Sequence, residues 1–110
     1  MSVGTALITG GQGDLAQVLK KELELGGMSV LSPSHAELDV CSSISVTNFF
    51  NSCRDRQLVL LINNAGVIDD SSLRRLSSKR WDSVLAANLD GVWRCCQAFI
   101  QGFTKRASSA

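Results

Sequence analysis

The stretch Leu58-Val-Leu-Leu-Ile-Asn-Asn-Ala-Gly66 joins five apolar residues directly to a polar turn of small residues. Unbroken apolar strands are typical of parallel sheets that helices cover on both faces. Ligands of open α/β sheets bind just beyond the carboxyl ends of the strands. The stretch therefore predicts a parallel α/β sheet, with a place for a ligand at the turn Asn63–Gly66.

Similar apolar runs predict the other strands of this sheet. They cover residues 4–9, residues 28–31 and the short segment Leu38–Val40, all ahead of Leu58–Ile62. Helical segments separate these runs, and such an alternation is typical of βαβ units. Right-handed crossovers then give the strand order 3-2-1-4, which is half of a doubly wound sheet.

Three helices are expected between and after these strands. The first has a stripe of four apolar residues at helical spacing, Leu15, Val18, Leu19 and Leu23. Ser42 or Ser43 caps a second helix that runs to about Arg56. Ser77 or Ser78 opens a long third helix that carries apolar residues on more than one face.

Composition narrows the function classes. The chain of 110 residues has a formal net charge of +1, with 19% charged residues. This balance provides no basic surface for nucleic acid or an anionic membrane, and no apolar run approaches the roughly 20 residues that a membrane span requires.

The four cysteines lack C-x-x-C spacing and the single histidine, His35, has no neighbouring ligands, so no metal site is expected. The cysteines fit small buried side chains in a reducing cytoplasm, where we expect the protein to reside.

The segment Gly11-Gln-Gly-Asp-Leu-Ala16 fits the pattern G-x-G-x-x-G/A between a strand and a helix. Glycines there allow the backbone to approach a pyrophosphate, whose charge the N-terminus of the helix stabilises. The same glycines also serve tight connections that bind nothing. A carboxylate at Asp14 suits a helix N-terminus but would repel a phosphate, so we expect its side chain to face solvent.

The end of the second strand bears on the choice of cofactor. Dinucleotide-binding folds place an acid there for the ribose 2′-hydroxyl, and this chain has Leu31-Ser-Pro-Ser34 instead. Ser32 or Ser34 can donate a hydrogen bond to a 2′-phosphate, which favours NADP slightly over NAD. Asp39, beyond the next strand, has two interpretations: a contact to the adenine or a helix-capping carboxylate.

Taken together, these motifs resemble the N-terminal, cofactor-binding half of a short-chain dehydrogenase/reductase. The matching segments are Thr9–Ala16, Leu38–Val40, Asn63–Gly66, Trp81-Asp82 and Asn88–Gly91. Within that family the chain is most similar to the reductases typified by 3-oxoacyl-acyl-carrier-protein reductase. The resemblance implies a partial Rossmann dinucleotide-binding domain over residues 1–105, a frayed tail over residues 106–110, and hydride transfer between NADP or NAD and a carbonyl or alcohol.

The resemblance also assigns roles to individual residues. Asn88 corresponds to the active-site asparagine that interrupts the long helix and helps to hold a water in the proton relay. Its alternative role is that of a polar residue that kinks the helix. The expected cofactor-binding residues are Thr9, Gly10, Gly11, Gln12, Gly13, Asp14, Leu15, Ser32, Asp39, Val40, Asn64, Ala65 and Gly66.

One departure from the family pattern limits the expected activity. The family's catalytic Tyr-x-x-x-Lys follows the asparagine, and this chain contains no tyrosine. We therefore expect a truncated oxidoreductase that is inactive alone and takes a small carbonyl or alcohol substrate only when completed. The alternative is a non-catalytic dinucleotide-binding or protein-interaction module. In complete family members the long helix commonly packs against a partner subunit, so a homo-oligomer or another partner is expected there.

Overall fold

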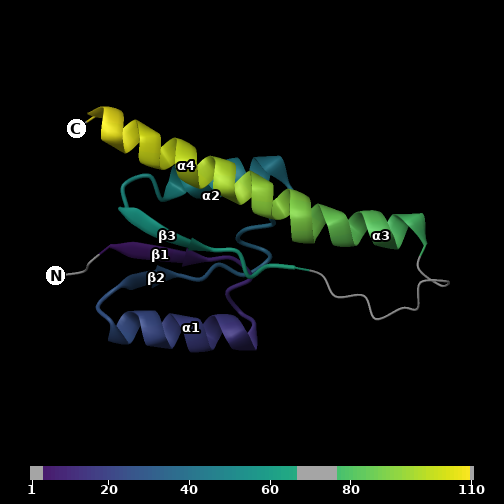
Figure 1. Ribbon diagram of the computed structural model, residues 1–110, viewed down its shortest axis with the longest axis horizontal. Helices are drawn as coiled ribbons and strands as arrows, with labels where there is room; N and C mark the ends of the chain where they lie inside the picture. Colours follow the sequence, from purple (N-terminus) through teal and green to yellow (C-terminus); the bar gives the residue numbers. More distant parts are fainter. Residues whose placement is uncertain (1–3, 67–76, 110) are drawn as a thin grey trace.

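The computed structural model describes residues 4–66 and 77–109, the last seven of them by backbone alone. Strands and helices alternate along the chain (Figure 1). In chain order the elements are β1 (Thr5–Ile8), α1 (Asp14–Leu25), β2 (Ser29–Leu31), α2 (Ser43–Ser52), β3 (Leu58–Ile62), α3 (Ser78–Leu85), the π-helical turn η1 (Ala86–Asp90) and α4 (Gly91–Ser109). The predicted α/β class is confirmed.

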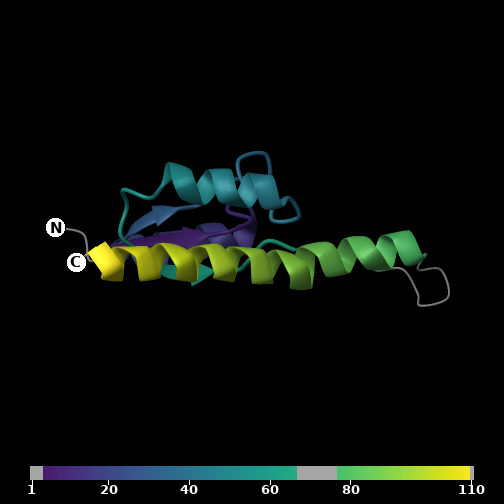
Figure 2. The ribbon, with the colours of Figure 1, turned by 90° about the horizontal axis from the view of Figure 1, so that it is seen from above.

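The sheet is parallel, and β1 lies at its centre with β2 and β3 on either side. Every residue of β1 is buried. Helix α1 covers one face of the sheet, and α2 and α4 lie on the opposite face (Figures 1 and 2). Because parallel strands align their carboxyl ends, the segments that follow β1, β2 and β3 meet at one edge of the sheet.

The expected strand at Leu38–Val40 is wrong, so the order 3-2-1-4 reduces to β2-β1-β3 in the described part of the chain. A turn intervenes, in which the Leu38 N–H donates to the Ser34 carbonyl oxygen at 2.9 Å. Leu38 and Val40 are nevertheless buried, packed with Val46 of α2 and Cys95 of α4. The apolar residues Leu38 and Val40 are therefore explained by packing against helices and not by pairing within the sheet.

The helix boundaries follow the sequence signals closely. Ser42 caps α2, because its hydroxyl oxygen accepts from the Ser45 N–H at 3.1 Å, and Ser77 caps α3 in the same way. Helix α2 ends at Ser52 and not near Arg56. The backbone of α4 extends to Ser109, and the fraying expected for residues 106–110 stays a prediction.

The buried face of α1 differs from the expected stripe. Ala16 is fully buried, whereas Leu15 and Val18 are mostly exposed. Ala16 brings the helix backbone close to the sheet, since its side chain is small. Leu19 and Leu23 of the expected stripe are half-buried, so only part of the stripe contributes to the core.

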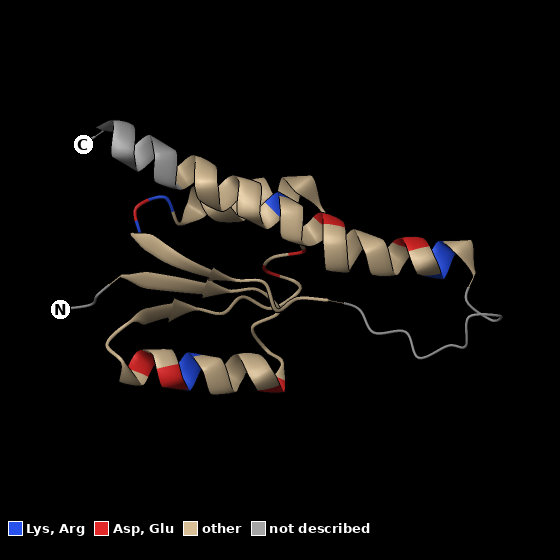
Figure 3. Cartoon of the chain, viewed as in Figure 1, with Lys and Arg blue, Asp and Glu red and all other residues tan. Residues whose placement is uncertain are grey.

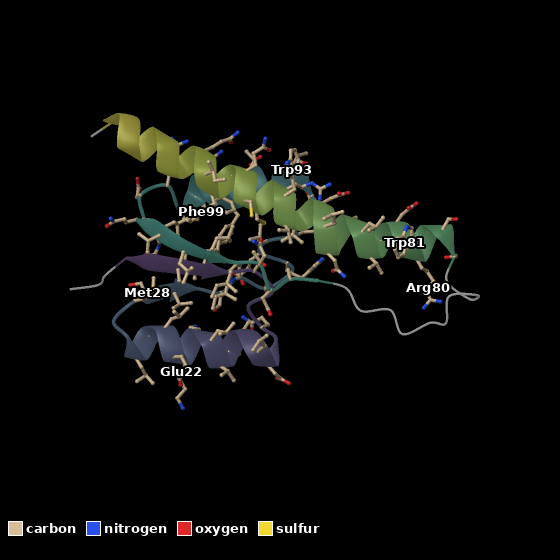
Figure 4. All side chains as sticks on the ribbon, viewed as in Figure 1. Glu22, Met28, Arg80, Trp81, Trp93 and Phe99 are labelled. Atoms are coloured by element: carbon tan, nitrogen blue, oxygen red, sulfur yellow. The ribbon has the colours of Figure 1, made fainter. Side chains whose placement is uncertain are left out.

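The segment α3–η1–α4 forms one long rod (Figures 1 and 2). The rod carries large apolar side chains that are at least half exposed, Trp81, Leu89, Trp93 and Ile100, and its side away from the sheet is called here the outer face. Trp93 points away from the sheet and Phe99 points toward it (Figure 4). Among the described residues, no helix combines the length and the apolar character needed to cross a membrane.

Candidate dinucleotide site

Two turns meet at the carboxyl edge of the sheet, and the hydroxyl of Thr9 joins them. Thr9 follows β1 and is 1% exposed. Its Oγ1 accepts from the backbone N–H groups of Asn64 at 3.0 Å and Ala65 at 2.9 Å. The Asn64 side-chain amide in turn donates to the Gly10 carbonyl oxygen at 3.1 Å. The glycine-rich turn and the Asn-Asn-Ala-Gly turn are thereby held together as one unit.

Glycine is required where these turns approach their neighbours. Gly10 has φ of +63°, and a Cβ there would lie 2.9 Å from the Ala65 Cα. A Cβ on Gly11 would lie 2.2 Å from the carbonyl carbon and oxygen of Ser32. The Gly11 N–H donates to the Pro33 carbonyl oxygen at 2.9 Å, so the loop after β2 is attached directly to the glycine turn.

The N-terminus of α1 has no side-chain cap, unlike those of α2 and α3. The first turn of any helix leaves backbone N–H groups without intrahelical partners. Around the capping residue Gly13 there is room, since a Cβ would come no closer than 3.5 Å to the Gly10 carbonyl oxygen. Gln12, Asp14 and Leu15 are exposed beside it, as was expected for the Asp14 carboxylate. The arrangement fits a phosphate-bearing ligand, because free N–H groups and the helix dipole favour an anion.

A carboxylate lies beside the end of β2. The Ser34 N–H donates to Glu37 Oε1 at 3.0 Å, and this hydrogen bond lowers the pKa of the Glu37 carboxyl. Asp39 Oδ1 accepts from the Cys41 N–H at 3.0 Å and lies 3.5 Å from His35 Nε2. Asp39 thus closes the turn ahead of α2, whose cap is Ser42 instead. Figure 3 shows the acidic residues of this loop beside the carboxyl ends of the strands.

The helical segment η1–α4 contacts two parts of the candidate site, the Asn-Asn-Ala-Gly turn and the loop that contains Val40. A Cβ on Gly66 would lie 2.7 Å from Asn88 Oδ1, so the Asn-Asn-Ala-Gly turn touches η1. A Cβ on Gly91 would lie 2.7 Å from Val40 Cγ2. Asn88 lies inside the π-helical turn, which confirms that the long helix is interrupted at this residue.

Sequence reasoning missed three residues that organise the site. Arg94 Nη1 donates to the Val40 carbonyl oxygen at 3.0 Å. Gln17 Nε2 donates to the Gly11 carbonyl oxygen, and Pro33 accepts from Gly11. The signal for Arg94 was its spacing from Gly91, because residues three apart are neighbours on a helix surface.

All four cysteines are free. Cys53 and Cys95 are buried as expected, whereas Cys41 is exposed. Burial, and then the neighbouring Cys96, raise the pKa of the Cys95 thiol to about 11, against the opposing effect of Arg94. A thiol in this state is not a nucleophile near neutral pH, so Cys95 serves packing.

Comparisons with known proteins agree with this geometry. A family model described as short chain dehydrogenase matches residues 4–110. The 3-oxoacyl-[acyl-carrier-protein] reductase of Pseudomonas aeruginosa is 30% identical over 105 residues, covering 94% of this chain and 40% of that protein. The corresponding reductase of Chlamydia muridarum is 39% identical over 51 residues, covering 46% of this chain and 21% of that protein. The chain thus spans less than half the length of these relatives.

Solved structures show the same fold. A 3-ketoacyl-(acyl-carrier-protein) reductase from Brucella melitensis, complexed with NADH, has a TM-score of 0.87 at 17% identity. The aligned part covers 98% of this chain and 53% of the reductase chain. A gluconate 5-dehydrogenase from Burkholderia cenocepacia, in complex with NADP and tartrate, has a TM-score of 0.81 at 21% identity, with coverages of 96% and 51%. At these identities the likeness establishes the fold alone.

Proposed function

Because the chain belongs to the short-chain dehydrogenase family, as its motifs indicated, we propose that it forms the dinucleotide-binding part of an NAD(P)-dependent oxidoreductase. Its reaction moves hydride between nicotinamide and a small carbonyl or alcohol substrate. The 110 residues contain no tyrosine, so this chain alone binds the cofactor without reducing a carbonyl. The free cysteines support a place in the reducing cytoplasm.

The uncapped N-terminus of α1 is the observation that carries the proposal. Serine hydroxyls satisfy the corresponding N–H groups of α2 and α3, whereas Gly13 provides none for α1. Thr9, Gly10, Gly11 and Asn64 hold the turn in place by contacts within the chain. Bound there, the pyrophosphate takes the position that a capping side chain has elsewhere. In the same proposal Asn88 is the catalytic asparagine. Three residues flank the adenosine: Ser32, Asp39 and Val40. The rest of the cofactor surface consists of Gln12, Asp14, Leu15, Ala65 and Gly66.

We propose NADP as the preferred cofactor, supported by the hydroxyls of Ser32 and Ser34. The carboxylate of Glu37, 3.0 Å from the Ser34 N–H, opposes a 2′-phosphate by its charge. The preference is therefore expected to be small. Parallel titrations with NADPH and NADH measure it, and tighter binding of NADH would contradict it.

The variant Gly13→Ala is expected to lower the affinity for NADPH much more than it lowers the stability of the fold. The added methyl has room within the chain, and because alanine is a poorer N-cap than glycine, the variant is expected to lose only about 1 kcal/mol of stability. The methyl also enters the space through which a pyrophosphate approaches. Loss of charged hydrogen bonds there is expected to weaken NADPH binding about tenfold or more. Fluorescence titration of NADPH, with the unfolding midpoint measured alongside, tests both parts.

Gly102→Ala is the matched control for this variant. A Cβ at Gly102 meets no other atom within 4 Å, and the residue lies in α4, far along the chain from the glycine turn. NADPH affinity is expected to stay unchanged in this control. Equal affinity in Gly13→Ala and wild type would contradict cofactor binding at the N-terminus of α1.

We further propose that the outer face of α3–η1–α4 is a contact between two copies of the chain. Trp93, 62% exposed, lies on this face, and the exposed Leu89 and Ile100 are four and seven residues away from it, which is the spacing of one helix face. Large aromatic residues dominate the free energy of protein interfaces, at about 2 kcal/mol or more each. Trp93→Glu is therefore expected to raise the dissociation constant of the dimer about 30-fold or more in sedimentation experiments.

Leu25→Glu is the control for self-association. Leu25 is 74% exposed on α1, which covers the opposite face of the sheet. The same charge introduced there is expected to leave the dissociation constant unchanged. A monomeric wild-type chain at every accessible concentration would contradict the proposed contact.

A further inference from the structure

We propose that Arg94 is a positioning residue that fixes the Asp39–Val40 segment as the adenosine end of the nucleotide site. This inference rests on the proposed dinucleotide binding. Arg94 lies in α4, 54 residues away in sequence from Val40, and its Nη1 donates to the Val40 carbonyl oxygen at 3.0 Å. Arg94 is half-buried and Val40 is buried.

The Asp39–Val40 segment needs such an anchor because it pairs with no strand in the described part of the chain. Buried backbone groups must find hydrogen-bond partners, and a segment outside the sheet finds them in side chains. Ser45 of α2 supplies one, since its Oγ accepts from the Asp39 N–H at 2.9 Å. Arg94 supplies the other from α4. Two helices thereby hold a segment that the sheet leaves unsupported.

The same face of η1–α4 also contacts the opposite end of the site. Gly66 of the Asn-Asn-Ala-Gly turn lies against Asn88, and Gly91 lies against Val40. Gly91 and Arg94 are three residues apart and both contact Val40, so they share one side of the helix. Arg94 thus attaches the adenosine segment to the same continuous helix that contacts the Asn-Asn-Ala-Gly turn at Gly66. Arginine suits this role, because its donors are held in a rigid planar group.

Nuclear magnetic resonance titrations of the purified chain with two overlapping parts of the cofactor test the inference. ADP-ribose contains the adenosine and the pyrophosphate, whereas nicotinamide mononucleotide lacks the adenosine end. Arg94→Met keeps the apolar stem of the side chain but removes the donor. Its affinity for ADP-ribose is expected to fall by up to about tenfold, because binding must then order a segment that the charged hydrogen bond no longer holds. Its affinity for nicotinamide mononucleotide is expected to stay within about twofold of wild type.

Two further variants keep the test decisive if Arg94→Met folds poorly. Arg94→Lys retains a charged donor and is expected to restore most of the ADP-ribose affinity. Ser45→Ala releases the segment from α2 and is expected to weaken ADP-ribose selectively as well. Arg54→Met is the control, because Arg54 is exposed and its side chain donates to the nearby Asn51 side chain, at 3.4 Å, and not to the Asp39–Val40 segment.

The outcomes separate this inference from the proposed function. Equal losses for both ligands in Arg94→Met, or no loss for ADP-ribose, would overturn the positioning role while leaving dinucleotide binding intact. A wild-type chain that binds neither ligand would contradict the proposed function and the inference together.

Discussion

Gly11→Ala is expected to destabilise the chain by about 3 kcal/mol and to abolish measurable cofactor binding. The new Cβ would lie 2.2 Å from the carbonyl carbon and oxygen of Ser32, which are backbone atoms that cannot rotate away. Either the loop after β2 or the start of α1 has to move. Movement of the loop would break the 2.9 Å hydrogen bond from Gly11 to Pro33.

Thermal and urea unfolding followed by circular dichroism measure this effect. A loss of about 3 kcal/mol is a large share of the stability of a single domain and corresponds to a fall in Tm of roughly 15 °C. Gly102→Ala is the control, because it fills open space in α4 and is expected to be neutral or stabilising by up to about 1 kcal/mol. A Gly11→Ala chain as stable as wild type would show that the backbone at Ser32 moves away from the new Cβ at little cost in free energy.

Thr9→Val is expected to cost about 1–3 kcal/mol, although valine has nearly the same shape. The substitution removes one oxygen that accepts two hydrogen bonds, from the N–H groups of Asn64 and Ala65. The Ala65 N–H then loses its partner at a site where Thr9 itself is 1% exposed, whereas the Asn64 N–H keeps its hydrogen bond to the Ile62 carbonyl oxygen at 3.1 Å. The turn Asn64–Ala65 also loses part of its attachment to the end of β1, so the affinity for NADPH is expected to fall together with the stability.

Two variants identify the hydroxyl as the cause. Thr9→Ser keeps the oxygen and loses only a methyl group, at a cost of about 1 kcal/mol. Thr47→Val makes the same exchange as Thr9→Val on the exposed surface of α2 and is expected to be neutral. If Thr9→Ser and Thr9→Val were equally destabilised, the two hydrogen bonds would not be the source of the effect.

Local signals predicted most of the elements. The apolar run Leu58–Ile62 is β3 with the expected bounds, and Ser42 and Ser77 cap their helices as expected. Such features depend on residues close in sequence: an N-cap needs a hydroxyl at one position, and a buried strand needs an unbroken apolar run. The glycine-rich turn was likewise identified, because its spacing follows from the geometry of a strand that turns into a helix.

The errors arose where a local pattern fits two environments. Leu38–Val40 is apolar because it packs on α2 and α4, and a short strand would have the same composition. Leu15 and Val18 fit an apolar stripe, yet Ala16 faces the sheet because its small side chain permits a close approach. Neither choice could be made before the packing partners were known.

The sequence by itself determined the parallel α/β class, the family and the residues of both turns, since these depend on spacing along the chain. Only the tertiary structure decided that Thr9 Oγ1 joins the two turns, that Gly11 touches Ser32, and that Arg94 reaches Val40. These contacts link residues 21 to 55 positions apart, and their partners come together only when the sheet and the long helix are assembled. The stretch Leu58–Gly66 therefore identified where the site lies, whereas the contacts that shape it come from β1, the loop after β2 and α4.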